Sequence, residues 1–284
     1  MLRVILTIAA ALAFSAPVAG QTTLAWKFVK GDSFTVEQQI SQATALEIKN
    51  KPFRQKSTLT LRTRWHVKDA DKAAATLTVV VESMTSAVST GDKAAAALKD
   101  DELWRGCEFT LIVDPQGRVR ELKGHDTLLK KLAGDDGQRL KLLTALKPPE
   151  STQALFQDVL GPLPAKPATP GDRWQHSATE SMSVFGSFVH TTDFIYRGDA
   201  RIETLIKTAY QAPRYAIEND VFRITKGEVK AGDGKGEIAF DAARGRVRRV
   251  HKSINVRGEL TLETLSGLER VGFTSATEVR IEVK

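Results

Sequence analysis

Apolar and polar residues alternate along much of the chain, which is typical of half-buried β-strands. The clearest example is residues 58–68, in which apolar and polar residues alternate. The apolar set is Leu59, Leu61, Trp65 and Val67, with Thr63 among them, and the polar set includes Arg62, Arg64, His66 and Lys68. A turn at 69–72 then leads to a second alternating stretch, 77–81. These patterns predict antiparallel strands joined by tight turns.

The period changes from two to about 3.6 between residues 125 and 163, which predicts short amphipathic helices. Its leucine-rich runs are separated by residues typical of helix ends. Asp126 and Ser151 are the predicted N-caps, and Gly134 and Gly161 the predicted C-caps. Helices of this kind commonly cover one face of a sheet.

Two stretches of the chain, 114–122 and 241–250, resemble each other and predict equivalent β-hairpins. In both, an apolar strand runs into an Asp, a glycine follows, and the next apolar residues lie three positions apart, at Val119 and Leu122 and at Val247 and Val250. A regular strand would place them two apart, so a bulge is expected after each turn. The shared irregularity predicts an internal duplication.

The duplication and the composition divide the chain into three parts. Residues 1–20 are predicted to be a signal peptide, residues 21–165 a first β-rich half that contains the helical segment 125–163, and residues 166–284 a linker and a second β-rich half. The linker is the proline-rich stretch 162–170. The predicted fold class is α+β and β-rich, with two similar halves of curved antiparallel sheet and short helices against the concave face.

The second half is expected to curl strongly. Over residues 249–263, Val250, Ile254, Val256, Leu260 and Leu262 fall on one face, and fifteen extended residues would span about 50 Å, more than the diameter of a half of this size. The strand must therefore bend, and Gly258 is the expected place. The glycine-rich stretch 232–236 is interpreted as a turn before the second hairpin, because a phosphate-binding loop would need Ser or Thr after its Lys and then a helix.

The start of the chain has a charged residue, Arg3, an apolar run over 4–14 and small residues up to Gly20. This is the pattern of a secretory signal peptide, with Gln21 as the expected mature start. No later stretch reaches the ~20 apolar residues of a transmembrane helix. We therefore expect an exported protein, periplasmic or extracellular, whose single cysteine, Cys107, has no partner for an internal disulfide.

The net charge of +7 indicates a moderately basic protein. In an exported chain this excess favours anionic glycans, lipid headgroups or solubility over nucleic acid. The basic cluster 244–252 also lacks the interleaved aromatic residues that nucleic-acid sites use for stacking. A nucleic-acid partner is not expected.

Catalytic and metal motifs are weak throughout. Ser33 follows Gly31 and Asp32, as in the lipases and esterases named for Gly-Asp-Ser-Leu, but no Asp-x-x-His follows to activate it. The five histidines, His66, His125, His176, His190 and His251, show no close metal-ligand spacing and are interpreted as surface residues. We therefore predict no enzymatic activity, no catalytic residue, no metal and no cofactor.

Four short stretches follow one another along the chain in a characteristic order. They are Gly31-Asp32-Ser33-Phe34, the hairpin from Asp114 to Val119, the leucine-rich stretch 140–163, and Gly171-Asp172-Arg173-Trp174. In this layout the chain resembles a family of exported bacterial proteins described as a domain of unknown function, a resemblance that implies no activity. A curved sheet with helices on its concave side is also similar to the half-barrel of the periplasmic lipoprotein carriers, which implies an apolar groove.

The predicted function is that of an exported, non-enzymatic binding or interaction protein, with an apolar or amphiphilic ligand in the concave sheet. Arg249 and Arg257 are the candidate ligand-binding residues, because guanidinium groups near the rim would suit an anionic headgroup. Two alternatives stay open: a structural module that contacts an envelope protein, and a hydrolase built on Ser33. A filled concave face would distinguish the structural module from the ligand binder.

Overall fold

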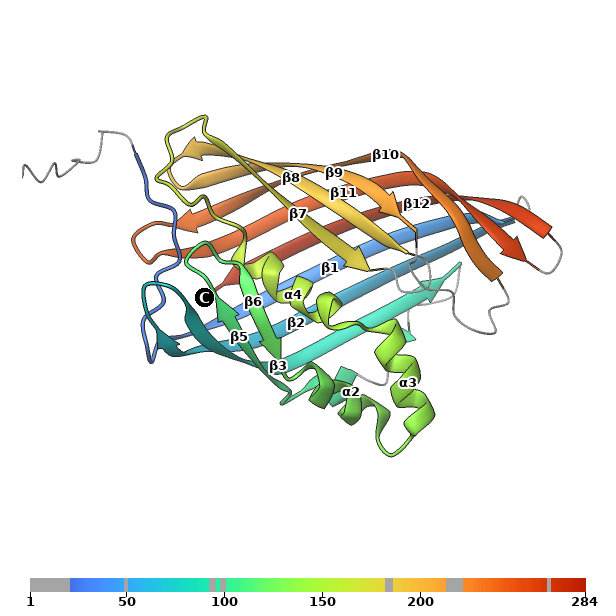
Figure 1. Cartoon of the computed structure of the whole chain (residues 1–284), viewed down its shortest axis with the longest axis horizontal. Helices are drawn as coiled ribbons and strands as arrows, with labels where there is room; N and C mark the ends of the chain where they lie inside the picture. Colours follow the sequence, from blue (N-terminus) through green and yellow to red (C-terminus); the bar gives the residue numbers. More distant parts are fainter. Residues whose placement is uncertain are drawn as a thin grey trace, which may run out of the picture.

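The computed structural model describes residues 21–48, 51–91, 96–97, 101–181, 186–212, 222–264 and 267–284, which form one large curved antiparallel sheet with four short helices (Figure 1). The strands are β1 Ser33–Ile48, β2 Lys51–Ala70, β3 Ala75–Thr90, β4 Ala96–Ala97, β5 Glu108–Val113, β6 Val119–Lys123, β7 Arg173–Ser181, β8 Ser187–Gly198, β9 Arg201–Gln211, β10 Phe222–Asp241, β11 Arg246–Thr264 and β12 Gly267–Val283. The helices are α1 Asp101–Trp104, α2 His125–Ala133, α3 Gly137–Leu146 and α4 Pro149–Leu160.

The strand order is β6-β5-β3-β2-β1-β12-β11-β10-β9-β8-β7, and β4 pairs with β3 beside this path. The two predicted halves meet where β1 pairs with β12, from Val36 opposite Val283 to Glu47 opposite Gly272. The predicted fold class, a curved antiparallel sheet with helices against its concave face, is confirmed. The sheet runs without interruption across both halves, and the division into domains at 165–166 stays a prediction.

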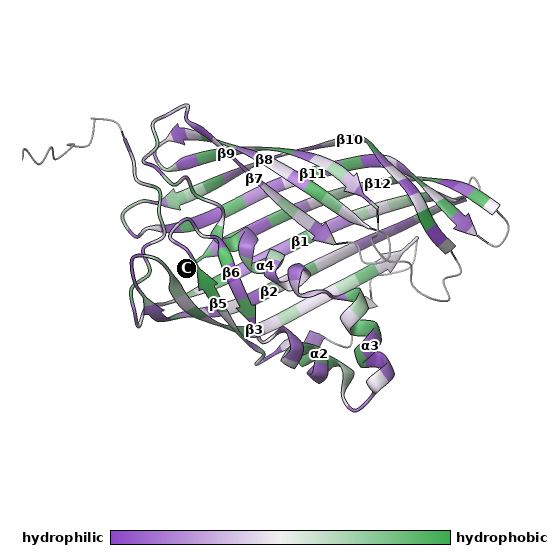
Figure 2. Ribbon diagram, viewed as in Figure 1, coloured by the Kyte–Doolittle hydropathy of each residue, from purple (hydrophilic) through white to green (hydrophobic). Residues whose placement is uncertain are grey.

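Alternation along the strands separates the two faces of the sheet, because successive side chains point to opposite sides. On β2, Trp65 and Val67 are buried on the concave side, whereas Arg64 and His66 are exposed on the convex side. Figure 2 shows the same alternation of hydrophobic and hydrophilic residues along the long strands. The apolar face therefore lines the inside of the curve.

The two predicted hairpins are equivalent elements. Gly117 (φ 77°) lies in the turn between β5 and β6, and Gly245 (φ 61°) lies in the turn between β10 and β11. The register of each pair shifts next to the turn, leaving Arg120 and Arg248 as the extra residues. The expected bulges are confirmed, and the duplication that they suggest stays a prediction.

Short helices occupy the predicted segment, and Gly134 and Gly161 are the C-caps of α2 and α4. The predicted N-caps are wrong: α2 is capped by Gly124 and α4 by Pro148. Each of these helices begins earlier than expected, so Asp126 and Ser151 lie within the first turn. The side chain that does cap a helix is Asp136, which accepts hydrogen bonds from two backbone amides at the start of α3.

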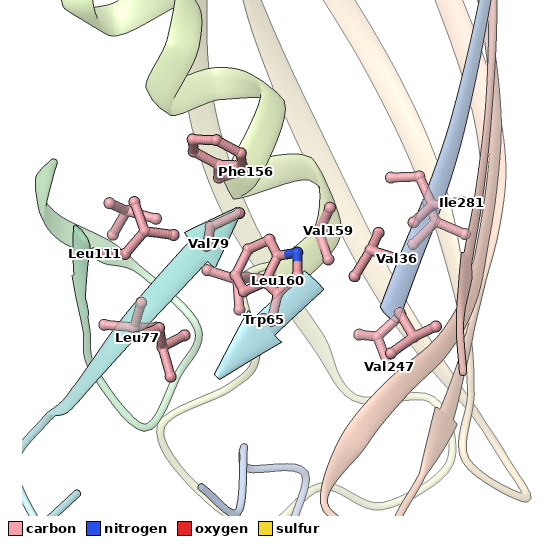
Figure 3. Close-up of a cluster of buried hydrophobic side chains, with 14 of the residues drawn as sticks. Val36, Trp65, Leu77, Val79, Leu111, Phe156, Val159, Leu160, Val247 and Ile281 are labelled. Carbon is pink, nitrogen blue, oxygen red and sulfur yellow. The ribbon is translucent and has the colours of Figure 1, made fainter. Parts of the chain in front are cut away.

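Helix α4 packs on the concave side of the sheet. Its apolar residues Phe156, Val159 and Leu160 are buried together with side chains of β1, β2, β3 and β5, and Val247 of β11 and Ile281 of β12 belong to the same cluster (Figure 3). The Phe156 ring meets the Trp65 ring edge-on, with 5.8 Å between centroids. The indole Nε1 of Trp26 donates a hydrogen bond of 2.7 Å to the Leu160 carbonyl, which fixes the end of the helix.

The glycine-rich stretch 232–236 is not a turn, and that interpretation is wrong. It lies in the middle of β10, paired with β9 and with β11. Gly232, Gly234 and Gly236 occupy successive positions that face the concave side of the sheet. A Cβ added at Gly236 would lie 2.4 Å from the carbonyl oxygen of His251. Absent side chains allow the strands to curl tightly at this point.

The curl brings distant strands together across the concave side. Phe188 of β8 and Phe273 of β12 have ring centroids 5.9 Å apart, although three strands separate β8 from β12 in the sheet. At Gly258, the expected bend, an added Cβ would lie 2.7 Å from the ring of Phe273 and 2.2 Å from the Glu228 carbonyl oxygen. The contact between Phe188 and Phe273 supports the predicted curl of the second half, and the bend at Gly258 stays a prediction.

Two further segments lie wholly or partly outside the described residues. The signal peptide at 1–20 lies outside the described residues and stays a prediction. The Ala-rich stretch 90–103, whose pattern suits either a helix or a crossover, contains β4 and the start of α1.

The proline-rich stretch 162–170 is held by paired backbone hydrogen bonds of 2.8 and 2.9 Å between Thr22 and Ala168.

Candidate functional site

The concave side of the second half is not completely filled. A cavity of about 290 Å³ lies between α4 and the inner faces of β7–β12 and is called the concave cavity below. Its wall is largely aliphatic and aromatic, formed by Phe194, Ile206, Ile238, Val250, Ile254 and Val279. These are the inward-facing positions of the alternating pattern, so the same periodicity that makes the strands also makes the wall apolar.

Helix α4 forms one side of the concave cavity and packs against the hydrophobic core with its buried residues. Gln157 fixes the helix to the first half, because its Oε1 accepts from the Val119 amide at 2.9 Å and its Nε2 donates to the Gly117 carbonyl at 2.8 Å. Gln157 also lines the concave cavity, as do Ala154 and Leu155 of the same helix. Ala154 is small, which leaves space at this point.

An ion pair between β11 and α4 forms part of the cavity lining. Lys252 of β11 contacts Asp158 of α4 with 2.8 Å between Nζ and Oδ1, and the side chains are only 21% and 35% exposed. Lys252 points inward between Val250 and Ile254. The pair therefore holds α4 to the second half, while Gln157 holds it to the first.

A histidine and a carboxylate form a second polar group in the wall. His190 Nε2 lies 2.9 Å from Glu180 Oε2, and His190 Nδ1 lies 2.9 Å from Thr208 Oγ1. The hydrogen bond with His190 is the main reason that the pKa of Glu180 falls below its ordinary value, and the charges of His190 and Lys252 add to the effect. Glu180 is therefore a carboxylate at neutral pH.

His176 and three threonines complete the polar part of the lining. Burial lowers the pKa of His176, and the positive charge of Arg118 lowers it further, so His176 is neutral at neutral pH. The threonines are Thr192, Thr204 and Thr277. Thr204 is 5% exposed, and its Oγ1 has no hydrogen-bond partner among the residues that the structure describes.

Arg249 and Arg257, the predicted ligand-binding residues, lie elsewhere. Both are exposed on the convex side of β11, and neither lines the concave cavity. Arg257 lines a shallow hollow of the convex face, of about 460 Å³, together with Arg54 and Lys56. A ligand-binding role for the two arginines stays a prediction.

Sequence reasoning missed the residues that do line the cavity. One signal was present: Lys252 interrupts the apolar set Val250, Ile254 and Val256, at a position whose parity points inward. A charged residue at an inward position of a strand needs a partner, and Asp158 supplies it from another part of the chain. Nothing in the sequence indicates that partner.

The other candidate residues of the sequence are scattered. Ser33 and His66 face each other on the convex side of β1 and β2, with 3.0 Å between Oγ and Nδ1. His251 is exposed, as predicted, and pairs with Glu278. The prediction for His125 is wrong, because this residue is 4% exposed and bridges Thr152 and the Lys147 carbonyl, joining α2 to the start of α4.

Comparisons with known proteins give weak likenesses only. No family model matches the chain, and no curated protein matches it. Among solved structures, one that concerns lipid–protein interactions in lipovitellin aligns with 91% of this chain and 26% of its own, at 12% identity and a TM-score of 0.48. The chain thus spans about a quarter of the lipovitellin chain.

Outer-membrane proteins also align at low scores. An outer membrane channel from Pseudomonas putida F1 aligns with 91% of this chain and 97% of its own, at 7% identity and a TM-score of 0.25. Pseudomonas aeruginosa OccK5 (OpdH) aligns with 89% and 98%, at 7% identity and a TM-score of 0.26. These likenesses carry no argument about function, and the family resemblance drawn from the sequence stays a prediction.

The described helices are short. The longest of them, α4, has 12 residues, and none among the described residues combines the length and apolar character needed to cross a membrane.

Proposed function

We propose that the protein is an exported binding protein that holds an apolar or amphiphilic molecule in the concave cavity. The observation that carries the proposal is the unfilled apolar space between α4 and the concave face, because protein interiors are otherwise closely packed. Export rests on the predicted signal peptide at 1–20, so the binding is expected in the periplasm or outside the cell.

The size of the cavity limits the ligand. Its volume of about 290 Å³ lies at the lower end for small-molecule sites. A single apolar chain suits this space better than a lipid with two chains.

Filling the cavity is expected to abolish binding. Ala154 lines the cavity from α4, so Ala154→Trp would place an indole in the ligand's space. We expect the wild-type protein to bind the neutral dye Nile red saturably, and Ala154→Trp to weaken that binding at least about tenfold. Fluorescence titration measures the affinity, and mass spectrometry of a solvent extract of the purified protein tests for a natural ligand.

The matched control is Ala145→Trp, because Ala145 is an exposed alanine on the neighbouring helix α3. This variant should bind Nile red as the wild type does, and thermal melts check that both variants fold. Saturable binding unchanged by Ala154→Trp would move the site away from the concave cavity. No saturable binding and no co-purifying lipid would favour the structural module that contacts an envelope protein.

We also propose that the protein is not an enzyme. The hydrolase alternative draws its support from the hydrogen bond between Ser33 and His66. Among the described residues, however, His66 has no carboxylate partner to orient it, and both residues lie exposed on the convex side. We expect no turnover of p-nitrophenyl butyrate; turnover that is lost in Ser33→Ala and kept in Ser83→Ala would establish the hydrolase.

A further inference from the structure

The charged side chains that face the concave cavity already have partners. Lys252 pairs with Asp158, and His190 pairs with Glu180. His176 is neutral, for the reasons given above. The Lys252 ammonium group, the cation among the described residues of the lining, is therefore not free for a ligand.

One neutral group of the polar lining is fully buried. The hydroxyl of Thr204 is buried and has no partner within the described part of the chain. A buried hydroxyl without a partner is destabilising, and an atom of a ligand can supply the missing hydrogen bond. Thr204 lies in one row with Gly236 and Lys252 across β9, β10 and β11, and it is flanked by apolar residues, with Phe194 opposite it on β8.

The Lys252 ammonium group is already paired with Asp158, so an anionic group at this place would lie close to the Asp158 and Glu180 carboxylates with no unpaired lysine to balance its charge. Like charges at this distance repel, and the Asp158 side chain is only 35% exposed, which limits screening by solvent. A hydroxyl, ester or amide group avoids this repulsion and can bond the Thr204 hydroxyl directly. The existing ion pairs therefore act against anionic ligands.

We propose that the amphiphile bound in the concave cavity carries a neutral polar group, as fatty alcohols and monoacylglycerols do, and that Thr204 is the residue that recognises it. This inference rests on the proposed function and specifies its ligand. It gives no role to Arg249 and Arg257, because their guanidinium groups lie on the other side of the sheet.

The test compares two ligands of equal chain length that differ in charge. Decanol and decanoate are titrated against bound Nile red at about pH 8, where the acid is ionised. We expect decanol to displace the dye at an at least tenfold lower concentration. Equal or better displacement by decanoate overturns the inference and leaves the binding function standing, whereas absence of dye binding overturns the binding function itself.

Two variants test the residues involved. Thr204→Val keeps the shape and removes the hydroxyl, and it should weaken decanol binding roughly tenfold, whereas Thr60→Val, on the exposed convex side, should not. Asp158→Asn frees the Lys252 ammonium group. The ratio of the decanoate concentration to the decanol concentration needed to displace the dye should therefore fall at least about tenfold. An unchanged preference in Asp158→Asn, or unchanged decanol binding in Thr204→Val, overturns the assignment.

Discussion

We expect Phe156→Ala to lower the free energy of unfolding by about 3–5 kcal/mol, the usual cost of removing a buried aromatic ring. Phe156 is 2% exposed, and its ring contacts the rings of Trp65 and Phe109 with centroids 5.8 and 5.2 Å away. Alanine favours the helix, so the loss would come from packing and not from helix propensity. Urea denaturation followed by tryptophan fluorescence measures the effect.

The matched control for this prediction is Leu142→Ala. Leu142 lies on α3, another helix of the same segment, and is 57% exposed. Its removal should change the free energy of unfolding by less than about 0.5 kcal/mol. A cost below about 1 kcal/mol for Phe156→Ala would mean that α4 is not part of the core, and α4 could then not form a wall of the concave cavity.

Gly236→Ala is expected to destabilise the protein by about 1–3 kcal/mol, as overpacking of a filled interior does. The new methyl group would meet the His251 carbonyl oxygen at 2.4 Å, with Lys252 Cβ and Thr204 Oγ1 at 2.8 Å. Backbone atoms of the neighbouring strand cannot rotate away as a side chain can. The sheet would therefore have to open at this point, and Nile red binding should weaken together with stability.

Gly137→Ala provides the contrast. Gly137 begins α3, a Cβ added there would have no heavy atom within 4 Å, and its backbone is not in the left-handed region. The substitution should raise stability by about 0.4–1 kcal/mol, because it reduces the freedom of the unfolded chain. If Gly236→Ala proved as stable as wild type, the tight curl of the second half would be refuted.

The local patterns predicted most of the fold. Alternation predicted the strands and which residues face inward, as Trp65 and Val67 show on β2. The three-residue spacing after Gly117 and Gly245 predicted the bulges that the registers contain. Predictions that failed concerned helix starts and the glycines of β10, where the same residue type suits both a turn and a tightly curled strand.

The concave cavity could not be derived in the same way. Its wall combines α4 with strands from β7 to β12, and the contact between Asp158 and Lys252 joins residues 94 positions apart. Only inward-pointing Lys252 carried a signal in the sequence, and Thr204 carried none.

The sequence by itself determined the period of each segment, because side-chain direction follows directly from backbone geometry: strands where residues alternate, helices at 125–163, and bulges after the turns. The tertiary structure alone decided how far the sheet curls, that α4 packs on the concave side and leaves space over the second half, and which charges meet across that space. The physical reason is that these features depend on contacts between residues far apart in the chain, whose distances are set by the packing of all the elements together.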